Sequence, residues 1–205
     1  MKKLIKENKL NNYILNPRDA NINFQLANEY FNSEQYASAL SYYLRCAELS
    51  NNDDIVYESL LISWVCIKNV ENRSTFERGQ LMSIASKFPH KPEVYYNLCN
   101  WLEKFGGNVF NSNEEKFQQM YLYACIGEKN IENEVKFQNF NEYPGYYGIL
   151  FYKAFAGWHI GEKKESEDIF IDLHNNHKLD YYFDTYVRNN INSLNIEHRI
   201  NEKNI

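Results

Sequence analysis

Three neighbouring segments decide the fold, namely Phe24-Gln-Leu-Ala-Asn-Glu-Tyr30, Tyr36-Ala-Ser-Ala39-Leu and Tyr43-Leu-Arg-Cys46-Ala-Glu-Leu49. In the first segment, small Ala27 stands where two helices can approach each other closely. In the next two, small Ala39, bulky Tyr43 and small Cys46 repeat this arrangement at helical spacing. The pattern predicts two packed antiparallel helices between about residues 20 and 50.

These segments resemble the tetratricopeptide (TPR) repeat, a helix pair of about 34 residues, when Ala20 is taken as the first position of the unit. Proteins of this kind stack their helix pairs into an extended surface. The resemblance therefore implies recognition of a partner rather than bond chemistry.

Helical periodicity continues along the rest of the chain. Further helices are expected at residues 55–68, 74–87, 92–105, 114–126, 146–159, 163–175 and 179–194. We predict an all-α, TPR-like α-solenoid of about four antiparallel helix pairs with a C-terminal capping helix. The repeat domain spans residues 20–195, between an N-terminal lead-in at 1–19 and a frayed tail at 196–205, and 127–144 forms an irregular linker.

Composition limits the possible environment and ligands. The chain has 205 residues and a net charge of -5, and it lacks the concentrated basic face that a nucleic acid requires. No apolar run approaches the roughly 20 residues of a membrane span, and the N-terminus lacks the pattern of a signal peptide. We expect a cytoplasmic protein whose Cys46, Cys66, Cys99 and Cys125 are reduced core thiols rather than zinc ligands.

A more specific resemblance covers about residues 22–194. The segments that carry this resemblance, in chain order, are Phe24–Tyr30, Pro89-His90-Lys91-Pro92-Glu93 with Tyr95-Tyr96-Asn97-Leu98, Trp158-His159-Ile160-Gly161 and Arg188-Asn189-Asn190. Together they are similar to the repeat region at the C-terminal end of family 2 glycosyltransferases. That family places an Asp-x-Asp metal motif in a preceding catalytic domain, and this chain contains no Asp-x-Asp. The resemblance implies a non-catalytic accessory module of glycan synthesis, with no cofactor of its own and with a glycosyltransferase as the expected partner.

Titratable motifs favour structural roles. His174-x-x-His177 could place two imidazoles on one helical face, but a metal site needs a third ligand, so we interpret the pair as polar residues at a helix end. Glu114-Glu115 and Glu165-x-Glu167-Asp168 stand beside Lys116 and Lys163, which is typical of a solvated helix face rather than a catalytic site.

Five residues are candidates for a partner-binding groove, because they occupy positions that would face the inner side of a TPR stack: Phe24, Asn28, Phe31, Tyr96 and Asn100. They predict a protein or peptide partner held by aromatic contact and amide hydrogen bonds. The alternative is that another helix or the N-terminal segment covers them. Glu58 at a further inner position makes the groove acidic and aromatic, which excludes a clamp for a carboxylate.

Two other functional classes remain open. A structural or assembly protein, such as a viral or phage component, is compatible with a short helical-repeat chain. An enzyme is a third hypothesis, although the sequence offers no cluster of titratable residues with a recognisable catalytic arrangement.

Overall fold

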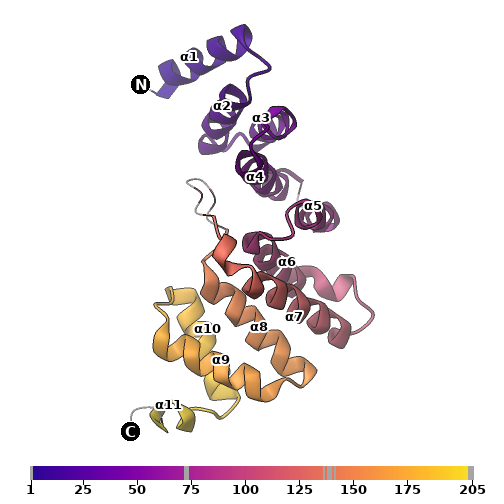
Figure 1. Cartoon of the computed structure of the whole chain (residues 1–205), viewed down its shortest axis with the longest axis vertical. Helices are drawn as coiled ribbons and strands as arrows, with labels where there is room; N and C mark the ends of the chain where they lie inside the picture. The colour runs from indigo at the N-terminus through magenta and orange to yellow at the C-terminus, as the bar shows by residue number, and fades with distance from the viewer. Residues whose placement is uncertain (1, 72–73, 136, 138–139, 141, 203–205) are drawn as a thin grey trace. The chain divides into compact units, whose positions relative to one another are not determined.

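The computed structural model describes residues 2–71, 74–135, 137, 140 and 142–202. These residues form eleven α-helices and two short 3-10 helices, and no strand is found among them (Figure 1). The predicted all-α class is thus confirmed for the described chain. None of the described helices combines the length and the apolar character needed to cross a bilayer.

The chain divides into two compact units. Unit 1 comprises Met1–Pro89 with Lys136–Asn141, and unit 2 comprises His90–Val135 with Glu142–Ile205. The helices of unit 1 are α1 (Lys2–Leu15), α2 (Ala20–Asn32), α3 (Tyr36–Leu49), α4 (Asp53–Glu71) and α5 (Ser74–Lys87). The helices of unit 2 are α6 (Pro92–Phe105), η1 (Gly106–Asn108), α7 (Asn113–Lys129), η2 (Ile131–Asn133), α8 (Tyr146–Ile160), α9 (Lys163–Asn176), α10 (Tyr181–Ser193) and α11 (His198–Glu202).

Most helix ends lie within two residues of the expected positions; the exceptions are the C-terminal end of α4, at Glu71 rather than residue 68, and that of α7. The sequence pattern ended α7 at Ile126, before Gly127, whereas the helix continues to Lys129. A Cβ atom on Gly127 would lie 3.1 Å from the Ile149 side chain and 3.3 Å from Tyr95. Gly127 therefore lies within α7 and allows Ile149 and Tyr95 to pack closely against the helix, rather than ending it.

In unit 1, successive helices pack against one another from α1 to α5. Asp19 caps α2 as its Oδ1 accepts a hydrogen bond from the backbone N–H of Ile22 at 3.0 Å. Ala27 of α2 and Ala39 and Cys46 of α3 are fully buried, and α3 packs against both α2 and α4. The small residues that the sequence pattern placed at a helix crossing are thus buried, as the pattern predicts.

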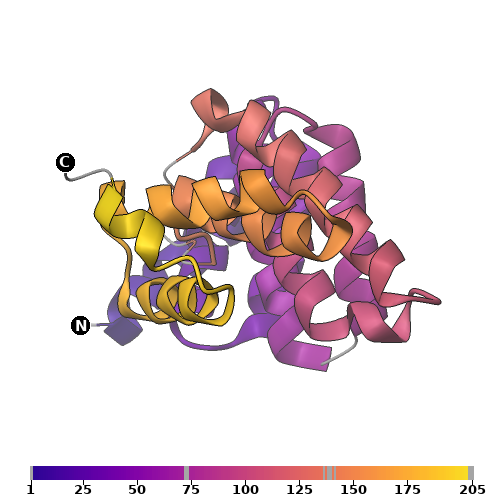
Figure 2. The same cartoon turned by 90° about the horizontal axis from the view of Figure 1, so that it is seen from below.

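In unit 2, successive helices also pack in chain order, and α8 additionally contacts α6 and α10. Gly161 ends α8 with a φ of +98°, a left-handed conformation that favours glycine. Helix α11 packs on α9. In Figure 2 the helices α10 and α11 have the colours near the yellow, C-terminal end of the scale. Arg199 of α11 pairs with Glu167 of α9 at 2.7 Å, within the part of the chain expected to be frayed.

The four cysteines are free thiols distributed between the two units. Cys46 and Cys66 lie in unit 1, and Cys99 and Cys125 lie in unit 2. The first three are buried and Cys125 is half-buried. Burial raises the pKa of Cys66 to about 12, so this thiol remains protonated at neutral pH.

Candidate functional site

The three predicted groove residues of unit 1 gather around Tyr43. The rings of Phe24 and Phe31 meet the Tyr43 ring edge-on, with centroid distances of 5.8 and 6.3 Å. The Tyr43 hydroxyl donates a hydrogen bond to Asn28 Oδ1 at 2.5 Å. All three predicted residues are half-buried, so they retain some accessible surface while also supporting the buried tyrosine.

The two predicted groove residues of unit 2 differ in accessibility. Tyr96 is only 7% exposed, because Tyr152 of α8 and Tyr143 cover it with ring centroids 5.5 Å away in each case. Asn100, one turn further along α6, is half-buried. Tyr96 is therefore covered by other parts of the chain, which was the alternative to its exposure in a groove.

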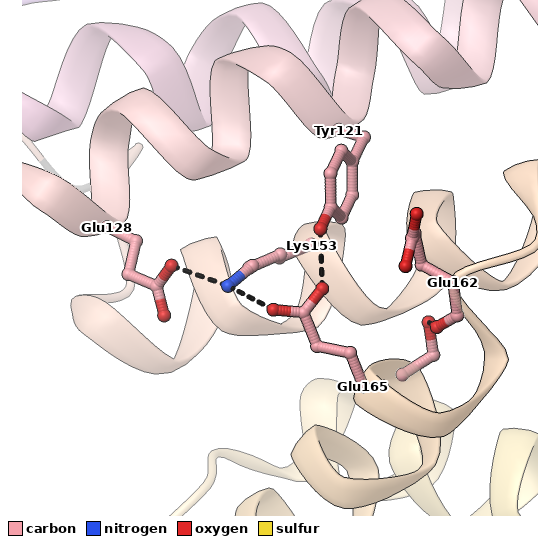
Figure 3. Close-up of polar contacts among 6 residues, drawn as sticks. Tyr121, Glu128, Lys153, Glu162 and Glu165 are labelled. Atoms are coloured by element: carbon pink, nitrogen blue, oxygen red, sulfur yellow. Dashed lines mark hydrogen bonds and ion pairs between the residues drawn. The ribbon is translucent and has the colours of Figure 1, made fainter.

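The most connected polar site of unit 2 is centred on Lys153 of α8 (Figure 3). Its Nζ lies 2.7 Å from Glu128 Oε2 of α7 and 2.8 Å from Glu165 Oε1 of α9. The second oxygen of Glu165 accepts a hydrogen bond of 2.5 Å from the Tyr121 hydroxyl of α7. One ammonium group thus links side chains from three helices, and we call these four residues the Lys153 network.

Small residues at the α8–α9 crossing bring the members of the Lys153 network together. A Cβ atom on Gly157 would lie 2.8 Å from Ser166 Oγ and 3.2 Å from the Tyr121 ring. Ser166 is buried and donates its hydroxyl hydrogen bond to the Glu162 carbonyl at 2.9 Å, within its own helix. Gly157 and Ser166 thus allow α9 to approach α8 closely enough for Glu165 to reach Lys153.

Mutual contacts fix the protonation states in the Lys153 network. Burial alone would raise the pKa of Glu165, but hydrogen bonds from Lys153 and Tyr121 outweigh it and lower the pKa. Burial alone would lower the pKa of Lys153, and its bonds to Glu128 and Glu165 raise it instead. Burial and the bond to Glu165 raise the pKa of Tyr121. At neutral pH the network therefore holds a charged lysine, a charged Glu165 and a neutral tyrosine, none of them ready to transfer a proton.

An open hollow of about 590 Å³ lies beside the network. Its lining residues come from α7, α8, α9 and the turn before α9: Glu128, Tyr146, Leu150, Glu162, Lys164, Glu165, Asp168, Ile169 and Asp172. Five of these nine residues are carboxylates and one is a lysine, so the hollow is acidic. Part of this charge is balanced, because Lys153 pairs with Glu128 and Glu165 and Arg199 pairs with Asp168.

The other titratable motifs have local partners. His177 Nε2 lies 3.2 Å from Asp172 Oδ2 at the end of α9. Within the described parts of the chain, no group of three or more His, Cys, Asp or Glu side chains is arranged to hold a metal ion. Glu115 helps to cap α7, since its backbone N–H donates to Ser112 Oγ and its carboxylate accepts from the Asn111 N–H.

The sequence interpretation missed the Lys153 network and placed Glu165 on a solvated face. The structure instead leaves the Glu165 side chain 39% exposed and pairs it with two other helices. A usable signal was present, because Lys153 is the only Lys, Arg, Asp or Glu in the otherwise largely apolar stretch 146–160. A lysine in such a helix needs a carboxylate partner when it is buried, and its side chain is only 11% exposed.

Comparisons with protein-family models and with curated proteins found no match to this chain.

Proposed function

We propose that this chain is a non-catalytic, TPR-like helical-repeat module that binds a protein partner, and that the partner acts in glycan synthesis. The observation that carries the proposal is the use of small residues at helix crossings in both units. Ala27 and Ala39 are fully buried on the packed helices α2 and α3, and Gly157 lies against Ser166 between α8 and α9. Helices that pack successively in this way are typical of repeat proteins that bind partners along an extended surface.

The electrostatics of unit 2 support recognition rather than catalysis. The ammonium group of Lys153 is engaged by two carboxylates, and its pKa is raised rather than lowered, unlike that of a nucleophilic lysine. The glycan context comes from the resemblance of residues 22–194 to the repeat region of family 2 glycosyltransferases.

Two measurements test this proposal together. The first is calorimetry with UDP-glucose and GDP-mannose in the presence and absence of Mn²⁺, for which we expect no metal-dependent binding. The second is affinity purification of the tagged chain from its source cells after mild cross-linking, for which we expect a glycosyltransferase among the recovered proteins. Specific donor binding or hydrolysis would place the chain among enzymes, and recovery in an ordered assembly without a transferase would favour the structural alternative.

A further inference from the structure

The carboxylate of Glu103 binds one tyrosine of unit 2 and lies near a group of others. Tyr152 of α8 donates its hydroxyl hydrogen bond to Glu103 Oε2 at 2.8 Å. The Tyr152 ring lies 5.5 Å from that of Tyr96 on α6, and on α10 the rings of Tyr182 and Tyr186 lie 4.4 Å apart. We call these five residues the tyrosine–glutamate cluster.

Ring contacts connect the α10 tyrosines to the tyrosine that binds Glu103, because the Phe151 ring lies 6.1 Å from that of Tyr186 and 5.5 Å from that of Tyr152. Burial raises the pKa of Tyr182, and the neighbouring Tyr186 hydroxyl and the Glu103 carboxylate raise it further. Burial likewise raises the pKa of Tyr96, with Tyr182 and Glu103 as the next causes. The hydroxyl groups of Tyr96 and Tyr182 therefore lie within the electrostatic reach of one carboxylate and of each other.

The cluster has a buried floor and an accessible rim. Tyr96 and Tyr152 form the floor, with 7% and 3% of their surface exposed. Tyr182 and Tyr186 form the rim, with 51% and 38% exposed, and Glu103 is half-buried between these extremes. A side chain of a partner can therefore reach the carboxylate while it contacts the rim tyrosines.

The negative charge of Glu103 is not balanced by a cationic side chain within the cluster. Within the described chain, Glu103 has a hydrogen bond from Tyr152 but no ion pair with a lysine, arginine or histidine. Asp180 adds further negative charge close to Tyr182, and its carboxylate accepts a hydrogen bond from the Tyr147 hydroxyl at 3.0 Å. The faces of the tyrosine rings carry negative potential as well, so every component of the rim favours a cation.

Building on the interaction function proposed above, we propose that the tyrosine–glutamate cluster binds an arginine or lysine side chain in a basic segment of the protein partner. The cation pairs with Glu103 and lies against the faces of Tyr182 and Tyr186. Such a site combines a cation–π contact with a carboxylate whose second partner is missing. Tyrosine and arginine are also the residue types that contribute most to binding energy at protein interfaces.

Residue positions on α6 connect this site to the predicted groove. Tyr96, Asn100 and Glu103 follow one another at intervals of four and three residues, so they share one face of the helix. The sequence pattern placed Tyr96 and Asn100 on the binding face and expected uncharged contacts there. Glu103 extends this face by one turn and adds a charge, so binding at the cluster depends on salt.

The test uses fluorescence anisotropy with the full chain and a labelled peptide of alternating glycine and arginine residues. Otherwise identical peptides with glutamine or glutamate in place of arginine serve as probes of charge. We expect the arginine peptide alone to bind, and we expect its affinity to fall as NaCl is raised from about 50 to 300 mM. Glu103→Gln and Tyr182→Ala should each weaken binding by about three- to tenfold.

Two control variants separate the site from general attraction to an acidic protein. Glu132→Gln removes the same charge from an exposed position of unit 2 outside the cluster. Tyr181→Ala removes an 88% exposed tyrosine from the same helix, one residue away and outside the cluster. Both should bind the arginine peptide as the wild type does, and circular dichroism should show that all four variants keep the wild-type helix content.

The outcomes distinguish this inference from the function on which it rests. Equal weakening by Glu103→Gln and Glu132→Gln, or by Tyr182→Ala and Tyr181→Ala, would overturn the cluster as a binding site. So would comparable binding of the glutamine or glutamate peptide. If Glu103→Gln and Tyr182→Ala still recover the same partner from cells as the wild type, the module binds its partner elsewhere and only the inference about the cluster fails.

Discussion

The α2–α3 hairpin of unit 1 and the α8–α9 hairpin of unit 2 are stabilised in different ways. On α2 and α3 the small residues Ala27 and Ala39 are fully buried, together with the larger Tyr43. Between α8 and α9 the small residues Gly157 and Ser166 are accompanied by a charged pair, Lys153 and Glu165. The first hairpin thus depends on packing and on the neutral hydrogen bond from Tyr43 to Asn28, whereas the second also depends on the ionisation of its side chains.

The largest expected effect tests the dependence of the α2–α3 hairpin on shape. Ala39→Trp should lower the free energy of unfolding by about 1 to 3 kcal/mol or more, because the fully buried site has no room for an indole. Urea unfolding followed by circular dichroism measures the loss. Ala37→Trp places the same side chain on the exposed side of α3 and should change stability far less. If the two variants unfold together, small residues do not determine this helix crossing.

A smaller effect is expected from the charged contact of the α8–α9 hairpin. Lys153→Met should cost about 1 to 2 kcal/mol at pH 7, between the values typical of exposed and of buried ion pairs. Lys178→Met removes an exposed lysine from the same unit and should cost much less. Equal stability of the two variants would show that the Lys153 network contributes little to the fold.

The stability that the Lys153 network contributes should also depend on pH. The folded-state pKa of Glu165 is lowered, so its contribution is fully present above the unfolded value of about 4.3 and is lost as pH falls through the folded value. The wild type should therefore lose stability on acidification below about pH 5, and Lys153→Met should lose less. Unfolding curves between pH 3 and pH 7 measure the difference.

The smallest effect concerns how the two hairpins begin. The Asp19 side chain caps α2, whereas Glu162, which precedes α9, makes no side-chain cap. Asp19→Ala should cost about 1 kcal/mol, and Asp19→Asn should retain most of that stability because asparagine also caps helices. Glu162→Ala should change stability by less than about 0.5 kcal/mol. A similar cost for both alanine variants would remove this difference between the hairpins.

Local features of the fold were predictable from the sequence. Ser74–Lys87 matches an expected helix at both ends, and the small residues Ala27 and Ala39 are buried as their spacing predicts. Helical periodicity, caps and breaking residues act over a few positions, so a single sequence contains them. The arrangement of the helix pairs as a TPR-like solenoid stays a prediction.

The contacts of the candidate sites were not predictable in the same way. Tyr121 and Glu165 are 44 residues apart, and their hydrogen bond depends on how α7, α8 and α9 pack. Tyr96 was predicted to face a groove, but Tyr143 covers it from a segment that the sequence marked only as an irregular linker. Neither contact leaves a periodic pattern, because each depends on tertiary packing rather than on neighbouring residues.

Each unit contains a buried thiol whose reaction can report local unfolding of that unit. Cys66 in unit 1 and Cys99 in unit 2 are buried, and burial raises the pKa of both, so an alkylating reagent reaches them only when the surrounding helices separate. Mass spectrometry of partially alkylated chains would therefore show which of the two thiols reacts first. It would also show how often both thiols have reacted in the same molecule. Correlated alkylation means that the two units open in a single event, and independent alkylation means that each has its own opening equilibrium.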